Sequence, residues 1–141
     1  MTYFLYTDKF LSIESMIFTE SLKSNRDFQK VYKSGKSFAN KYLVMYVLEN
    51  GTENNRLGIS VSKKVGNSVV RHRVKRLIKE SYRLHEGVFN SGLDIVVIAR
   101  QSAAAVGFFE VESALLHLAK LHEIIKIYFS WNRLWIGASQ S

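Results

Sequence analysis

The spacing of the apolar residues changes twice between residues 56 and 99, and this change constrains the fold more than any other feature. Residues 56–62 alternate between apolar and polar side chains, which predicts a half-buried antiparallel strand with Leu57, Ile59 and Val61 inward and Gly58, Ser60 and Ser62 outward. From residue 68 to about residue 85 the apolar residues recur every three or four positions, which predicts an amphipathic helix. Residues 93–99 form a nearly continuous β-branched run that is typical of a central strand.

Two more helices are predicted on either side of this unit. Residues 25–33 place Phe28, Val31 and Tyr32 on one helical face, with Asn25 as the N-cap and a glycine just past the end. Apolar residues repeat at helical spacing again from residue 111 to residue 125.

Residues 38–48 are rich in Tyr, Val, Leu and Met and predict a further strand. Alternation gives this strand two apolar faces, with Tyr42 and Tyr46 on the same face. A turn-forming cluster around Gly51 follows, so we expect a hairpin with residues 56–62. The order of elements predicts an α/β fold of the α+β kind, a two-layer sandwich with about four strands in one mixed sheet and three helices.

Composition narrows the class of protein. The 141 residues suit one domain, and 20 Lys and Arg against 12 Asp and Glu give a formal charge of +8. A folded domain with this excess of cations is typical of a protein that binds a polyanion. The absence of Cys excludes disulfides, thiolate zinc sites and a thiol nucleophile, and it suits the cytoplasm. No run of about 18 apolar residues occurs, so no membrane span is predicted.

The charge is concentrated in residues 63–79, which contain seven cations and no acid. Lys63 and Lys64 precede the N-terminus of the predicted helix, where oriented N–H groups and the helix dipole favour a phosphate. The alternative is an ordinary solvated helix face. Such a face normally mixes both signs at i, i+4 spacing, whereas Arg71, Lys75 and Lys79 repel one another at that spacing. The pattern therefore favours a phosphate-binding surface.

The aromatic residues allow two interpretations. Phe28 and Tyr32, together with Tyr42 and Tyr46, could form a platform on which unpaired bases stack. Aromatic pairs at helical spacing are more often part of a core.

Catalytic patterns are absent: Gly35-Lys36-Ser37 lacks the rest of a P-loop, the four histidines lack metal-ligand spacing, and the carboxylates form no acid–base pair. No self-contained active site is predicted.

Four segments in their order along the chain resemble the protein component of bacterial ribonuclease P: Phe28–Gly35, Leu57–Asn67, Arg71–Arg76 and Asp94–Arg100. The resemblance covers about residues 16–126, and the long middle segment is highly specific. The chain departs from the family at His72, where Asn is usual, so the carboxamide group of the usual Asn is missing there.

The resemblance implies a fold and a function. The basic helix would lie in a left-handed βαβ crossover of an α/β sandwich. The catalytic RNA subunit, with bound Mg²⁺, would remove the 5′ leader of precursor tRNA, and the protein would bind no cofactor alone and need no protein partner. The resemblance implies contact with the leader by Phe28, Tyr32, Tyr46, Lys63, Lys64 and Arg100. It implies contact with the RNA subunit by Arg71, His72, Arg73, Lys75, Arg76 and Lys79.

The resemblance also divides the chain. We expect the RNA-binding domain to span residues 16–127, with Met16 as the natural start. Residues 1–15 and 128–141 are then extensions, and our hypothesis that they have no function is refuted if trimming them abolishes precursor cleavage.

Other classes of protein remain as alternatives. A ribosomal or general RNA-binding protein would share the charge and the sandwich, but it would not require the aromatics together with the Arg71-His72-Arg73 segment. A DNA-binding helix-turn-helix would need another helix directly before the basic one. A protein nuclease would need a carboxylate cluster.

Overall fold

The computed structural model describes residues 19–126, and every structural statement below refers to these residues. The expected extensions at residues 1–15 and 128–141 lie outside them. The elements in chain order are β1 (Thr19–Ser21), α2 (Asn25–Ser34), β2 (Lys36–Ala39), β3 (Leu43–Glu49), β4 (Asn55–Ser60), α3 (Ser68–Leu84), β5 (Leu93–Ala99) and α4 (Phe108–Leu121). Short 3-10 turns cover Glu86–Val88 and Gln101–Ala105.

The five strands form one mixed sheet in the order β1-β4-β5-β3-β2. Strand β4 runs parallel to β1 and β5, whereas β3 runs antiparallel to β5 and β2. The β-branched run is the central strand β5, and six of its seven residues are buried, as its composition predicted. The α+β class and the mixed sheet are confirmed, with five strands instead of about four.

The predicted hairpin between residues 38–48 and 56–62 is wrong, because β5 lies between β3 and β4. Residues 36–49 instead form their own hairpin of β2 and β3. The Asn40 side chain causes the reversal, since its Oδ1 accepts hydrogen bonds from the backbone N–H groups of Tyr42 (3.2 Å) and Leu43 (3.0 Å). Tyr42 therefore lies in a turn and packs with the larger core, on the opposite side of the sheet from Tyr46.

The prediction that β4 is antiparallel with one solvated face is also wrong. Leu57 and Ile59 face the larger core as expected. Gly58 is buried as well, because the ring of Phe28 lies against it, and a Cβ at Gly58 would be only 2.6 Å from Phe28 Cζ. Glycine was interpreted as an outward polar position, but it is the residue that lets an aromatic ring approach the sheet.

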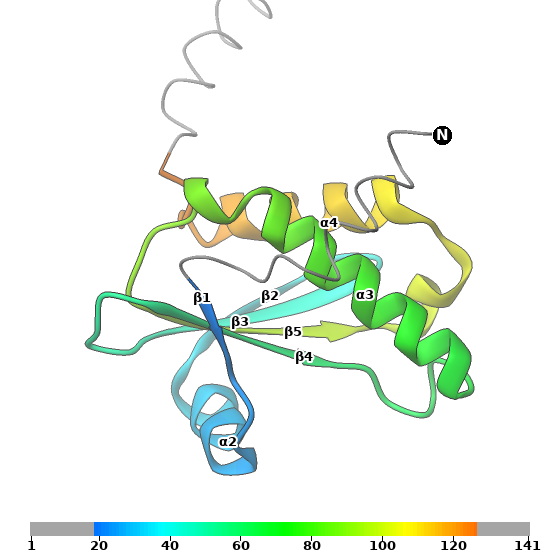
Figure 1. The fold of residues 1–141 in the computed structure, drawn as a ribbon, viewed down its shortest axis with the longest axis horizontal. Coiled ribbons are helices and arrows are strands. Elements are labelled where there is room, and N and C mark those ends of the chain that lie inside the picture. The colour runs from blue at the N-terminus through cyan, green and yellow to red at the C-terminus, as the bar shows by residue number, and fades with distance from the viewer. Residues whose placement is uncertain (1–18, 127–141) are drawn as a thin grey trace, which may run out of the picture.

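Helices cover both faces of the sheet, as Figure 1 shows, with α2 on one side and α3 and α4 on the other. The larger core lies between the sheet and α3 and α4. A smaller core of Leu22, Val31 and Val96 lies under α2. The prediction of two layers is therefore incomplete, because α2 forms a partial third layer. This helix covers only part of the sheet face on which it packs.

Helix α3 connects the parallel strands β4 and β5. Its predicted apolar stripe is its buried face, with Val74, Ile78 and Ser81 inside. Asn67 caps its N-terminus by accepting a hydrogen bond from the backbone N–H of Val70 at 3.0 Å. The cap of α2 is Ser24, one residue before the expected Asn25. The left handedness of the crossover stays a prediction.

Candidate nucleic-acid interface

Three aromatic side chains form a continuous row on the α2 side of the sheet. The ring centroids of Phe28 and Tyr32 are 6.2 Å apart, and those of Tyr32 and Tyr46 are 5.1 Å apart in an edge-to-face arrangement. All three side chains pack on the smaller core, yet each is only partly buried. We call Phe28, Tyr32 and Tyr46 the aromatic row. The rings are therefore core on one side and accessible on the other, and base stacking on the accessible side stays a prediction.

An ion-pair network fixes α2 to the sheet next to this row. Arg56 on β4 donates to Asp94 on β5 through Nε (2.9 Å) and Nη2 (2.6 Å), and to Asp27 on α2 through Nη1 (3.2 Å). Asn50 donates to the same Asp94 carboxylate at 3.0 Å. Asp27 directly precedes Phe28, so the network holds the start of the aromatic row.

The network also explains a buried charge. Asp94 has a side-chain exposure of 3%. Burial alone would raise its pKa, but the hydrogen bonds from Arg56 and Asn50, with the positive charge of Arg56, hold the pKa of Asp94 below its ordinary value. The carboxylate is therefore ionised whenever the protein is near neutral pH. Nothing in the sequence pattern pairs these residues, because they come from three separate segments.

The basic face of α3 points away from the core. His72, Lys75, Arg76 and Lys79 are exposed. The two flanking arginines are held by backbone carbonyl groups: Arg71 Nε donates to Gly66 (3.2 Å), and Arg73 donates to Ala104 and Val106. Arg73 thereby ties α3 to the segment before α4. The structure brings all six residues of this predicted set onto one helix.

A second basic surface lies where the parallel strands β4 and β5 end. A hollow of about 520 Å³ there is lined by Lys41, Lys64 and Arg100, among others. The structure therefore places Lys64 and Arg100 around one hollow, while the exposed Lys63 is not part of the lining. Lys41 was missed by sequence reasoning because a single lysine in a turn carries no periodic pattern.

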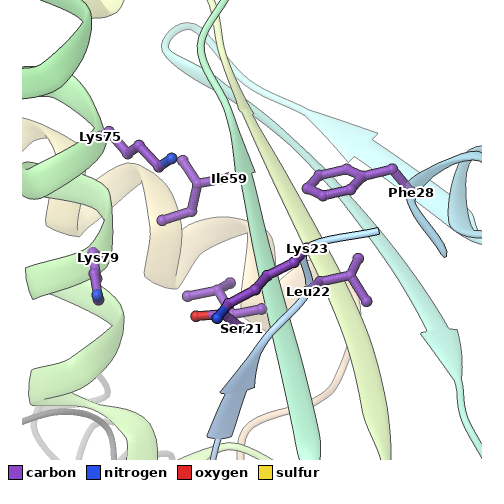
Figure 2. Close-up of a pocket in the computed structure, with 8 residues that line it drawn as sticks. Ser21, Leu22, Lys23, Phe28, Ile59, Lys75 and Lys79 are labelled. Atoms are coloured by element: carbon purple, nitrogen blue, oxygen red, sulfur yellow. The ribbon is translucent and has the colours of Figure 1, made fainter. Parts of the chain in front are cut away.

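A groove between α2 and α3 brings the two predicted sets of residues together. It has a volume of about 420 Å³ and is lined by Ser21, Leu22, Lys23, Phe28, Leu57, Ile59, Lys75 and Lys79. Figure 2 shows Lys75 and Lys79 on α3 at one side of β4 and Phe28 on α2 at the other. Phe28 was expected at the leader and the two lysines at the RNA subunit. Lys23 was assigned to neither.

Residues 19–126 contain no group of three or more His, Asp and Glu side chains that could hold a metal ion. None of the helices in this range is long and apolar enough to cross a membrane.

Comparison with known proteins decides the family. The family model described as Ribonuclease P matches residues 16–123, which is most of the chain. The chain belongs to the ribonuclease P protein family. The protein component from Lachnoclostridium phytofermentans is 65% identical to it over 107 residues, covering 76% of this chain and 92% of the relative. The protein component from Clostridioides difficile is 51% identical over 107 residues, covering 75% of this chain and 94% of that relative.

Solved structures of the ribonuclease P protein share the fold. The Staphylococcus aureus protein at 2.0 Å superposes with a TM-score of 0.70 at 40% identity, covering 74% of this chain and 96% of that one. The Thermotoga maritima protein gives a TM-score of 0.67 at 40% identity, covering 72% and 96%. The family and the fold predicted from the four segments are confirmed. The roles of the individual site residues stay predictions.

Proposed function

We propose that this chain binds the single-stranded 5′ leader of precursor tRNA with its aromatic row while α3 contacts the catalytic RNA subunit of ribonuclease P. Membership of the family supports the subunit role. One observation supports separate surfaces for the leader and for the RNA subunit: the aromatic row and the basic face of α3 lie on opposite sides of the sheet.

The aromatic row suits an unpaired strand. Stacking of a base on an aromatic side chain contributes about 1–3 kcal/mol and does not depend strongly on sequence. Phe28, Tyr32 and Tyr46 offer adjacent partly exposed rings, held in place by the Arg56 network. Lys64 and Arg100 lie beyond the ends of β4 and β5, where they would contact the phosphates of the same RNA strand.

The basic face of α3 suits a structured RNA. Exposed cations at every turn of the helix can contact successive phosphates of a folded backbone, and arginine does so bidentately. His72 is exposed at the point where Asn is usual. A histidine there can donate to a phosphate, but it offers no carboxamide.

Catalysis is assigned to the RNA subunit in this proposal, and so is the Mg²⁺ ion. The bound Mg²⁺ would supply the activated nucleophile and stabilise the leaving oxygen. The protein's part is to bind and orient the leader beside the RNA. We expect this work to take place in the cytoplasm, with precursor tRNA as substrate and no obligate protein partner.

A reconstitution experiment tests the proposal. The full chain is mixed with a ribonuclease P RNA and a precursor tRNA at low Mg²⁺ concentration, and the rate of leader removal is compared with that of the RNA alone. We expect the protein to increase the rate. No stimulation at any protein concentration would exclude the subunit role, and binding without stimulation would favour a general RNA-binding protein.

A further inference from the structure

We infer that the groove between α2 and α3 binds the phosphate backbone of the single-stranded leader, so that Lys23, Lys75 and Lys79 are leader contacts. This inference rests on the proposed function and extends it. It moves Lys75 and Lys79 from the RNA subunit to the substrate, and it adds a residue that the family resemblance did not assign.

The charge of the groove indicates a polyanion. Three of its eight lining residues are lysines, and none is acidic. All three lysines are exposed, and they come from two separate places in the chain, the segment after β1 and the helix α3. Figure 2 shows the Lys75 ammonium group directed toward Ile59, over the strand that forms the floor of the groove. Three cations that line one groove attract phosphate.

The edge of β4 in the groove is open. Strand β1 pairs with β4 only as far as Leu57, whose carbonyl group accepts a hydrogen bond from the Leu22 N–H at 2.8 Å. Alternate residues of a parallel strand direct their backbone groups to the same side, so the N–H and C=O of Ile59 also point to this edge. No strand among residues 19–126 covers them. These backbone groups can hydrogen-bond the edge of a base.

The groove continues directly from the aromatic row. Phe28 lies over Gly58 of β4, belongs to the row through its contact with Tyr32, and lines the groove as well. A strand that stacks on Tyr46 and Tyr32 can therefore pass Phe28 and cross the open edge of β4 without leaving the protein surface. Its bases would meet Phe28 and Ile59, and its phosphates would meet the lysines.

A nucleic acid fits the groove better than a peptide does. An open strand edge alone would accept an extended peptide by β-augmentation. A neutral peptide would offer no negative charge to the three lysines, whereas a phosphate backbone neutralises them. The aromatic ring beside them is the second component of a single-strand site.

Substitution of the lysines in the reconstituted holoenzyme tests the inference. Lys23→Ala and Lys79→Ala should each weaken the binding of precursor tRNA about two- to fivefold at moderate salt. Each should reduce the slope of log K against log salt by about 0.7, the value for a contact with a single strand. Binding of mature tRNA should be unchanged for both variants, and binding of the RNA subunit should be unchanged for Lys23→Ala, since Lys23 belongs to neither predicted set. Lys120→Ala, an exposed lysine on α4 outside the groove, is the matched control.

The outcomes separate this inference from the proposed function. If the wild-type protein favours precursor over mature tRNA but the lysine variants keep that preference, the groove assignment is wrong and the aromatic row stands. If the variants lose affinity for the RNA subunit instead, the groove binds that subunit. If the wild-type protein shows no preference for precursor tRNA, the leader-binding function itself fails. Binding of an acidic peptide that competes with no RNA would also overturn the inference.

Discussion

The substitution Gly58→Ala should displace Phe28 without touching any charged group. A Cβ at Gly58 would lie 2.6 Å from Phe28 Cζ, 2.8 Å from Phe28 Cε1 and 3.2 Å from Leu22 Cβ. Ordinary contacts between carbon atoms are about 3.5–4.0 Å, so the ring must move by about 1 Å. Because Gly58 is buried and pairs with Val96 of β5, the backbone has little freedom to retreat.

Two opposing effects set the size of the stability loss. Inserting a methyl group into a packed site costs about 1–3 kcal/mol. Replacing glycine by alanine returns about 0.4–1 kcal/mol because the unfolded chain has fewer conformations. We expect a net loss of about 1–2 kcal/mol in the free energy of unfolding, measured by urea denaturation. The displaced ring should also weaken precursor tRNA binding by the holoenzyme about fivefold, or about 1 kcal/mol.

A double-mutant cycle tests this reasoning. In a Phe28→Ala background the ring is gone, so Gly58→Ala should change the free energy of unfolding by less than about 0.5 kcal/mol. Gly87→Ala is the control, because no atom lies within 4 Å of a Cβ at that position. If Gly58→Ala costs the same with and without the Phe28 ring, the contact between them does not determine the position of the ring, and the reasoning is refuted.

Three further predictions follow from the charged groups. Arg71→Ala and Arg76→Ala should weaken RNA-subunit binding and flatten its salt dependence by about one unit of slope each, and an unchanged slope would show that they contact no phosphate. Asp94→Asn should cost about 3 kcal/mol at pH 7. The pKa of Asp94 is lowered from 3.8, so the carboxylate stabilises the fold fully above that pH, and this contribution is lost as the pH falls below it. The difference in the free energy of unfolding between the wild type and Asp94→Asn should therefore be smaller at pH 3 than at pH 7. Burial lowers the pKa of His122 from 6.5, so stability should fall as the pH drops from about 7.5 to 5.5, and His122→Gln should flatten that fall.

The elements with strong local patterns were predictable from the sequence. The amphipathic stripe of α3 and the β-branched run of β5 each carry their own burial pattern, and the structure agrees with both. The pairing of the strands was harder to predict from the sequence. The parallel contact of β4 with β5 joins strands separated by a 17-residue helix, whereas the expected hairpin used the nearest partner in sequence.

Single residues whose role depends on topology were not predictable. Gly58 was interpreted as an outward position because nothing near it in sequence indicates a ring from α2. Lys23 and Lys41 stand alone in short connections, so no periodicity marks them. The fold places Lys23 in the same groove as Lys79 and Lys41 in the same hollow as Arg100, and only this placement indicates a role for them. The partners of Asp94 were not predictable either, because Arg56 and Asn50 come from other segments.

The central claim is that the protein recognises the leader, and one ratio of affinities tests it most directly. The dissociation constants of precursor and mature tRNA are measured for the RNA subunit alone, for the holoenzyme, and for the holoenzyme with Phe28→Ala and Tyr32→Ala. Since each stack contributes about 1–3 kcal/mol, we predict that the wild-type protein raises the preference for precursor at least about tenfold and that the double variant loses most of this gain. Equal effects of the protein on both tRNAs, or a preference that survives the double substitution, would contradict the account.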